Sequence, residues 1–214
     1  MMYPFLIAFL LIICLIMLLI IVSLSQRLDQ SRKIQALANM NAQTDALTQL
    51  VNRRGFDQYL QIEWQKMLST TAPLSLLMLD VDNFKHYNDQ KGHLAGDACL
   101  VDMAKIMKSV IQRHGDTIAR YGGDEFAILL PNTSLQSAIS LAEKLVEKVA
   151  LKYTKISQVS LSIGIASCQA KQLYNQNQAC IKQSATQLVS VADHALYQVK
   201  KQGKNAVLGQ YLTP

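Results

Sequence analysis

The chain has 214 residues, half of them hydrophobic, and lysine and arginine exceed aspartate and glutamate by 21 to 15. A net charge of +6 is compatible with nucleic-acid binding, but the basic residues are dispersed and form no stripe with aromatic residues. We therefore predict no nucleic-acid partner. The four cysteines are scattered without a Cys-x-x-Cys pair, which favours neither a disulfide framework nor a zinc site.

Residues 1–24 are predicted to form a transmembrane helix. Residues 5–22 are uninterrupted apolar sequence, and about 20 such residues cross the hydrocarbon core of a bilayer. A buried core helix and a signal peptide are the alternatives, but a basic leader and a small-residue cleavage site are missing. Arg27, Arg32 and Lys33 follow the apolar run and nothing basic precedes it. The positive-inside tendency then predicts a single-pass protein of the cytoplasmic (inner) membrane with its C-terminal body in the cytoplasm.

Residues 25–44 are polar and contain neither glycine nor proline, so we expect a helical juxtamembrane linker. Its apolar spacing supports a coiled coil only weakly. The remainder, residues 45–212, has the length of one domain with a single core.

Within this domain, strand and helix signals alternate. Helices are expected at residues 52–68, 97–112, 134–150 and 188–200, and strands at 74–79, 159–166 and 205–208. Residues 117–130 read as a hairpin, which requires an antiparallel pair of strands. The pattern therefore predicts an α/β fold with a mixed sheet and packed helices.

The most informative stretch is the run Arg120-Tyr121-Gly122-Gly123-Asp124-Glu125-Phe126. We interpret its two glycines as the tight turn of the hairpin, because glycine adopts the positive φ angles that such turns require. Two carboxylates follow at the hairpin tip, where they are costly to hold together without a cation. A polar turn without chemistry is the alternative interpretation.

A second acidic pair, Asp80 and Asp82, ends the predicted strand at residues 74–79. Their side chains would point to the same side if the strand continued. For Asp82 we favour a capping role at the next helix, a role less fitting for Asp80. If the hairpin lies beside this strand, Asp80, Asp124 and Glu125 converge, and such oxygen ligands hold Mg²⁺ while substrate phosphates complete its shell.

Over residues 45–208 the chain resembles the GGDEF family of diguanylate cyclases. The resemblance rests on many short matches in the family's order, which are Asp45-Ala46-Leu47-Thr48, Asn52-Arg53-Arg54, Asp80-Val81-Asp82-Asn83-Phe84-Lys85, Asn88-Asp89, Gly92-His93, Gly96-Asp97, Gly122–Phe126, Ser162-Ile163-Gly164-Ile165-Ala166, Ala192-Asp193, Ala195-Leu196-Tyr197 and Gly203-Lys204-Asn205.

This resemblance implies a fold related to the palm of nucleotide cyclases and polymerases. It also implies condensation of two GTP into cyclic di-GMP and two pyrophosphates by a homodimer, with Mg²⁺ or, alternatively, Mn²⁺. Each site would hold one GTP, so two domains must meet face to face. The membrane helix and linker would raise their effective concentration.

Carried over residue by residue, the resemblance assigns roles to individual side chains. The resemblance assigns metal binding to Asp80, the Val81 carbonyl, Asp124 and Glu125. It implies that Glu125 also helps to deprotonate the attacking 3′-hydroxyl. Phosphate contacts fall to Lys85, Lys200, Lys204 and the backbone near Asn83 and Phe84.

Guanine recognition falls to Asn88 and Asp97, since a carboxylate accepts from guanine N–H groups and an amide both donates and accepts. Without the resemblance, these two residues read as loop and cap residues.

Arg113 and Asp116 match the family's Arg-x-x-Asp site for inhibition by product. Arginine can hydrogen-bond guanine O6 and N7 with two nitrogens. The alternative is an ordinary helix end, with Arg113 in the last turn and Gly115 at the C-terminal cap.

The chain departs from the family pattern at three positions. Gln49 and Val51 replace the usual Gly and Pro in the first turn of the domain, where we expect a local change. Lys204 replaces Arg, which keeps the charge but loses the planar fork. The rival interpretations are a non-catalytic GGDEF module that binds GTP or cyclic di-GMP, and a membrane scaffold.

Overall fold

The computed structural model describes residues 17–28, 30, 43–70, 72–153, 159–169 and 184–212. The chain divides into two compact units, Met1–Ala42 and Gln43–Pro214. In the first unit, residues 17–28 are helical, and among the described residues no helix is both long and apolar enough to cross a bilayer. Most of the span predicted at residues 1–24, and residues 31–42 of the predicted linker, lie outside the described residues.

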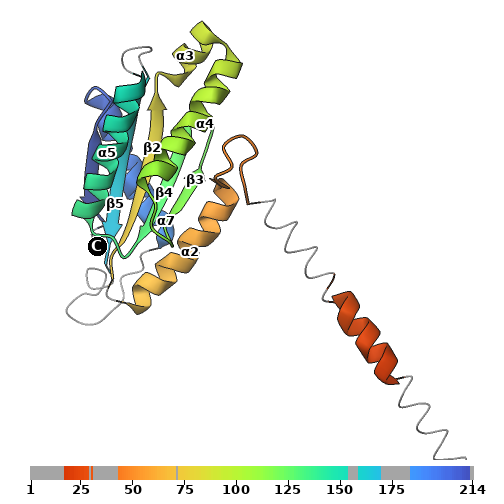
Figure 1. Cartoon of the computed structure of the whole chain (residues 1–214). Helices are drawn as coiled ribbons and strands as arrows, with labels where there is room; N and C mark the ends of the chain where they lie inside the picture. The colour runs from red at the N-terminus through yellow and green to blue at the C-terminus, as the bar shows by residue number, and fades with distance from the viewer. Residues whose placement is uncertain are drawn as a thin grey trace, which may run out of the picture. The chain divides into compact units, whose positions relative to one another are not determined.

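The second unit is built on a six-stranded sheet with the order β1-β3-β4-β2-β5-β6 (Figure 1). Strand β2 is central and pairs antiparallel with β4 and β5, and β3 pairs antiparallel with β4. The outermost pairs, β1 with β3 and β5 with β6, are parallel. The predicted mixed sheet is therefore confirmed, with strands at Val51–Asn52 (β1), Leu74–Asp82 (β2), Thr117–Arg120 (β3), Glu125–Pro131 (β4), Ser160–Cys168 (β5) and Val207–Tyr211 (β6).

Helices cover both faces of the sheet. Helices α4 and α5 pack on one face and α2 and α7 on the other, and two separate clusters of buried residues lie between them and the sheet (Figure 1). The helices span Arg53–Ser69 (α2), Phe84–Lys91 (α3), His93–Val110 (α4), Leu135–Tyr153 (α5) and Ala185–Lys201 (α7).

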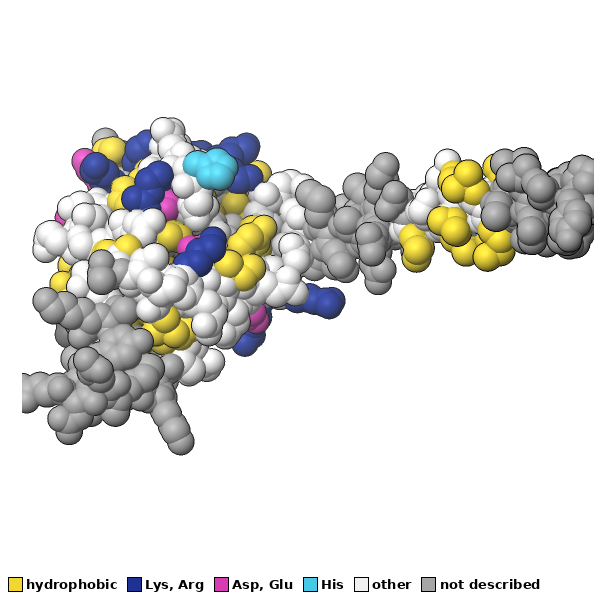
Figure 2. Space-filling view, turned by 90° about the horizontal axis from the view of Figure 1, so that it is seen from below, with side chains coloured by type: hydrophobic (Ala, Val, Ile, Leu, Met, Phe, Trp, Pro, Cys, Tyr) yellow, Lys and Arg dark blue, Asp and Glu magenta, His cyan; other side chains and the backbone are white. Residues whose placement is uncertain are grey.

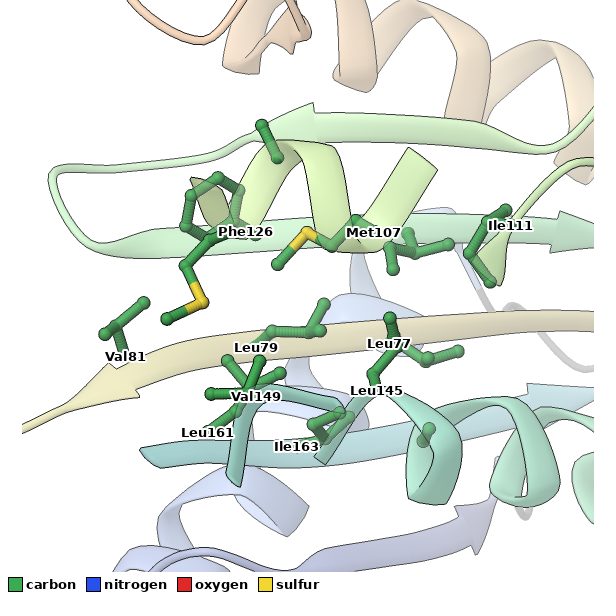
Figure 3. Packing of buried hydrophobic residues seen from close by; sticks show 14 of the residues in the cluster. Leu77, Leu79, Val81, Met107, Ile111, Phe126, Leu145, Val149, Leu161 and Ile163 are labelled. Atoms are coloured by element: carbon green, nitrogen blue, oxygen red, sulfur yellow. The ribbon is translucent and has the colours of Figure 1, made fainter. Parts of the chain in front are cut away.

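The two-residue repeat of a strand assigns each β2 side chain to one of these layers. Leu77, Leu79 and Val81 join the cluster under α4 and α5, where they meet Phe126 and Met107 (Figure 3). The intervening residues, such as Met78, join the cluster under α2 and α7. Asp80 and Asp82 continue this second set, so their side chains belong to the α7 side of the sheet.

Element boundaries differ from the sequence prediction mainly around α3 and α4. The helix expected at residues 97–112 begins at His93 and ends at Val110. Helix α3, which precedes it, was not predicted, because it has only eight residues and its apolar contact with the core is limited to the partly buried Phe84 and Tyr87. Strand β2 also runs to Asp82, three residues beyond its predicted end, because its last residues still pair with β5.

Gly164 of β5 allows α7 to approach the sheet backbone to backbone. A Cβ atom at this position would lie 2.1 Å from the amide nitrogen of Leu196 and 2.2 Å from the carbonyl oxygen of Ala192. Any side chain there would push α7 away from the sheet, since neither backbone atom can rotate aside.

The first turn of the domain keeps a backbone conformation that suits glycine. Gln49 stands where the family pattern has Gly, and its φ angle is 54°. For a residue with a Cβ atom this left-handed conformation costs about 1–2 kcal/mol. Glutamine in place of glycine at position 49 therefore makes the folded conformation of this turn less favourable.

Candidate functional site at the β2 end and the β3–β4 hairpin

The predicted hairpin is confirmed, but the reason given for its glycines was wrong. Strands β3 and β4 pair up to Arg120 opposite Phe126, and the amides of Tyr121 and Gly122 both donate to the Glu125 carbonyl. Neither Gly122 nor Gly123 has a φ angle in the left-handed region.

Space for a side chain explains Gly122 better than backbone conformation. A Cβ atom at Gly122 would lie 2.5 Å from Oε2 of Glu125, so the missing side chain makes room for that carboxylate. A Cβ atom at Gly123 would meet nothing within 4 Å. The backbone at Gly123 thus leaves open space beside the acidic pair.

Arg120 holds the hairpin turn and links it to the start of the domain. Its Nε and Nη2 atoms donate to the Gly123 carbonyl at 3.1 and 2.8 Å, and Nη1 lies 3.3 Å from both carboxylate oxygens of Asp45. Burial would raise the pKa of Asp45, but hydrogen bonds from Thr48 and the charge of Arg120 outweigh it and hold that pKa below its usual value. Asp45 is therefore a charged anchor for the turn, a role that its sequence position did not reveal.

Strand register brings Asp80 to the hairpin. Asp80 is the direct partner of Glu125 across the β2–β4 ladder, and the Val81 amide donates to the Asp124 carbonyl at 3.2 Å. Side chains directly opposite each other in an antiparallel pair lie on the same face, with Cβ atoms about 4.5–5.5 Å apart. The structure thus brings together the positions predicted to bind metal.

Lys200, at the end of α7, compensates the charge of this site. Its Nζ atom lies 2.7 Å from Oδ2 of Asp80. Burial raises the pKa of Asp80, the nearby charges of Asp124 and Asp82 raise it further, and Lys200 opposes both effects only in part. The charged form of Asp80 is therefore disfavoured by its surroundings, and a second positive charge would relieve that cost.

The acids do not close into a complete metal cage by themselves. Among the described residues, no three His, Cys, Asp or Glu side chains lie close enough to hold one ion. Like charges directly opposite on a sheet are destabilising, so the pair formed by Asp80 and Glu125 still suits a divalent cation. Mg²⁺ commonly takes one or two carboxylates and completes its shell with water and substrate phosphates.

The capping role expected for Asp82 was wrong. Its carboxylate is buried and accepts hydrogen bonds from the hydroxyls of Ser160 and Ser162 at 2.7–2.9 Å and from the Asn205 amide at 3.2 Å. The N-cap of α3 is instead Asn83, which makes no side-chain capping bond. Asp82 therefore ties β2 and β5 to the turn after α7. Serines at alternate positions of β5 were the available sequence signal.

Two of the residues predicted to bind phosphate, Asn83 and Lys204, contact each other next to Asp82 and its partner Asn205 in the chain. Lys204 Nζ donates to Asn83 Oδ1 at 2.8 Å, across 121 positions of sequence. Phe84 begins α3 and packs against the core, and Lys85 is exposed one residue later. The three-residue turn at 203–205, which carries Lys204, has positive φ angles throughout.

The predicted guanine-binding residues lie on consecutive helices. Asn88 is on α3, and its Oδ1 atom is buried and lacks a hydrogen-bond partner among the described residues. Asp97 is exposed on α4, directly after Gly96. Both helices follow β2 in the chain and flank the turn at Gly92.

Arg113 and Asp116 form a separate site. The Arg113 Nη2 atom donates to Asp116 at 3.1 Å, to the Thr133 hydroxyl at 2.8 Å and to the Pro131 carbonyl. Burial raises the pKa of Asp116, and the charge of Arg113 opposes this. A cavity of about 470 Å³ borders the pair and extends to Lys144 of α5. Helix α4 has already ended at Val110, so the helix-end alternative for Arg113 does not hold.

The chain belongs to the GGDEF family. The family described as "Diguanylate cyclase, GGDEF domain" matches residues 42–206, which is most of the chain. The predicted relationship to the GGDEF cyclase palm is thereby confirmed, and the acidic positions lie where the sheet and hairpin meet.

Two curated relatives carry the same family name. Diguanylate cyclase DgcM of Escherichia coli (strain K12) is 34% identical over 182 residues, which are 85% of this chain and 42% of that protein. Diguanylate cyclase A of Treponema denticola is 44% identical over 138 residues, which are 63% of this chain and 34% of that protein. The chain thus spans less than half the length of these two relatives.

A solved structure shows the same fold. The coiled coil and GGDEF domain of DgcB from Caulobacter crescentus, in complex with c-di-GMP, superimposes with a TM-score of 0.73 and 25% sequence identity. The match covers 87% of this chain and 95% of that chain.

We predict that the two aspartates of β2 differ in their effect on stability. Asp82→Asn should lower the free energy of unfolding by about 2 kcal/mol, because an amide cannot accept from all three donors. Asp80→Asn should leave the free energy of unfolding equal or higher in metal-free buffer, because a raised pKa means that the charged carboxyl costs stability. Urea denaturation of both variants measures the difference.

The pH dependence provides the control. The folded state binds the Asp80 proton more tightly than the unfolded state, so any gain from Asp80→Asn is fully present above the raised pKa, shrinks as the pH falls through it, and is gone below about pH 4, where the carboxyl is protonated in both states. A large loss of stability in Asp80→Asn at neutral pH would contradict this account of the site.

Proposed function

We propose that the protein is a diguanylate cyclase that condenses two GTP into cyclic di-GMP and two pyrophosphates. The single observation that supports this proposal most directly is the pairing of Asp80 with Glu125 across the β2–β4 ladder, next to the ammonium of Lys200. The relatives of this chain that are named diguanylate cyclases support the same activity.

The chemistry is a pair of phosphoryl transfers. In each, a 3′-oxygen forms a bond to the partner nucleotide's α-phosphorus, the bond to pyrophosphate breaks, and the 3′-hydroxyl proton leaves. We assign acceptance of that proton to Glu125, whose carboxylate has space beside Gly122. Lys85, Lys200 and Lys204 would hold the phosphates, together with the backbone near Asn83 and Phe84. Asn88 and Asp97 would bind guanine.

A divalent cation fits the donor set. Asp80, Asp124, Glu125 and the Val81 carbonyl would hold Mg²⁺, or Mn²⁺ as the alternative, and a cation bound there supplies neutralisation of phosphate charge. A bound cation would neutralise the Asp80 carboxylate in place of Lys200. The Lys200 ammonium could then bind a substrate phosphate.

The direct test is to incubate the purified protein with GTP and Mg²⁺ and to look for cyclic di-GMP by mass spectrometry. Glu125→Gln should reduce product formation at least about 100-fold, because a general base and metal ligand is lost while size is kept. Glu147→Gln, an identical change at an exposed position of α5, should remain active. Nucleotide binding without product in the wild-type protein would favour the non-catalytic alternative.

We further propose that the protein acts as a homodimer anchored in the inner membrane by one N-terminal helix, with the domain in the cytoplasm. The uninterrupted apolar run at residues 5–22 supports an anchor. In the described helix at residues 17–28, the six consecutive apolar side chains from Met17 to Val22 are each 44–61% exposed, and Figure 2 shows exposed apolar side chains on the face turned to the viewer. Six consecutive residues of an α-helix cover its whole circumference. A helix that is apolar all round requires a nonaqueous environment.

Removal of residues 1–42 should therefore lower specific activity in dilute solution. The full-length protein in membranes confines two domains to one surface, so its activity per mole should be nearly independent of concentration. The 43–214 fragment should lose activity steeply in the nanomolar range and regain it at micromolar concentration. Equal activity of both proteins at nanomolar concentration would contradict the proposal.

Product feedback at Arg113 and Asp116 is also proposed. All three hydrogen bonds of Arg113 use Nη2, and its other two nitrogens have no partner within the described part of the chain. These two nitrogens could donate hydrogen bonds to O6 and N7 of a guanine base. The neighbouring cavity of about 470 Å³ supplies room for a nucleotide.

Arg113→Ala should thus relieve inhibition by added cyclic di-GMP at least about tenfold, as measured by the concentration that halves the initial rate. Uninhibited turnover should change little, because Arg113 is not part of the acidic site. Lys148→Ala on α5, which removes an exposed cation outside the residues that line this cavity, serves as the control. Unchanged inhibition of Arg113→Ala would refute the feedback site.

A further inference from the structure

Gly96 occupies an unusual position in α4. It is the fourth residue of the helix, is buried, and donates its amide to the Gly92 carbonyl in the first turn. Its φ angle is not in the left-handed region, so the backbone conformation does not require glycine. Glycine inside a helix is less favourable than alanine. Some other constraint must favour it here.

The constraint is the side chain of Asn88 on α3. A Cβ atom at Gly96 would lie 1.7 Å from Asn88 Oδ1, 2.8 Å from its Cγ and 3.2 Å from its Nδ2. The Asn88 amide therefore lies in the space that any side chain at position 96 would fill. Even alanine, the smallest substitution, would force this amide to move.

No hydrogen bond holds Asn88 Oδ1 where it is. The atom is buried and has no partner among the described residues, an arrangement that normally lowers the stability of a fold. The amide is thus positioned by its packing against Gly96, and its displacement would cost the fold little. Asp97, the second residue proposed to bind guanine, directly follows Gly96. The same turn of α4 therefore makes room for the Asn88 amide and presents the Asp97 carboxylate.

We infer that Gly96 is a positioning residue for base recognition: it makes room for the Asn88 amide and thereby sets the discrimination of guanine from purines that lack the 2-amino group. The inference rests on the proposed function for the nucleotide, while Gly96 itself touches neither nucleotide nor reacting atoms. An amide held in one orientation can distinguish a base that presents the matching donors from one that does not.

A double-mutant cycle tests this inference in the full-length protein. Gly96→Ala should raise the KM for GTP about tenfold or more with little change in kcat, and should narrow the preference for GTP over inosine triphosphate. Its melting temperature should not fall, because alanine favours the helix. Asn88→Ala should show the same two kinetic changes. The double variant Asn88→Ala/Gly96→Ala should be no worse than Asn88→Ala alone, because the displaced group is absent.

Three outcomes would overturn the inference. One is an unchanged KM and base preference in Gly96→Ala. Another is a double variant about tenfold worse than Asn88→Ala, which would mean that Gly96 acts on something other than Asn88. The third is a wild-type protein that neither binds nor turns over GTP, which would also overturn the proposed function. If GTP binds without turnover, calorimetric affinities for GTP and inosine triphosphate in the same variants replace KM.

Discussion

The double pairing of strand β2 is the constraint on which the site depends. Its antiparallel partners β4 and β5 fix the register on both sides, so that Asp80 faces Glu125 on one strand and Ser162 on the other. A slip of one residue in either ladder would turn the acidic side chains to the opposite face, under α4 and α5. Such a slip is costly because β2 is buried along its whole length, and the carboxylates of Asp80 and Asp82 would enter the apolar cluster that now holds Leu79 and Val81.

The two aspartates at the end of β2 show how one strand can hold two carboxylates for different purposes. Asp82 is surrounded by hydrogen-bond donors and acts as part of the scaffold. Asp80 has Lys200 as its cationic partner, and burial together with acidic neighbours raises its pKa. Stability is thus given up at the position where an external cation or substrate would supply the missing charge, as is common where binding sites are built into a fold.

Much of this arrangement could be predicted from the sequence, because apolar periodicity and the order of motifs both reflect the sheet. The hairpin, the mixed sheet and the approach of Asp80 to the acidic turn were predicted in this way. Helix α3 was missed because it is short and only Phe84 and Tyr87 pack, partly buried, against the core. Asp82 was misassigned because its partners lie about 80 and 120 positions away in the chain. The role of Gly122 was misjudged because local turn preferences carry no information about which side chain needs the space.

The direct contact of α7 with β5 at Gly164 has a mechanical consequence. No side chain separates the helix backbone from the strand, so the helix cannot slide or tilt without steric overlap. Lys200 lies four residues after Leu196, one helical turn beyond the contact. The contact therefore fixes the position of the Lys200 backbone, from which its ammonium reaches Asp80. In the proposed dimer, each subunit would then contribute a rigid half of the active site. The activity would be regulated by how the two subunits are placed relative to each other.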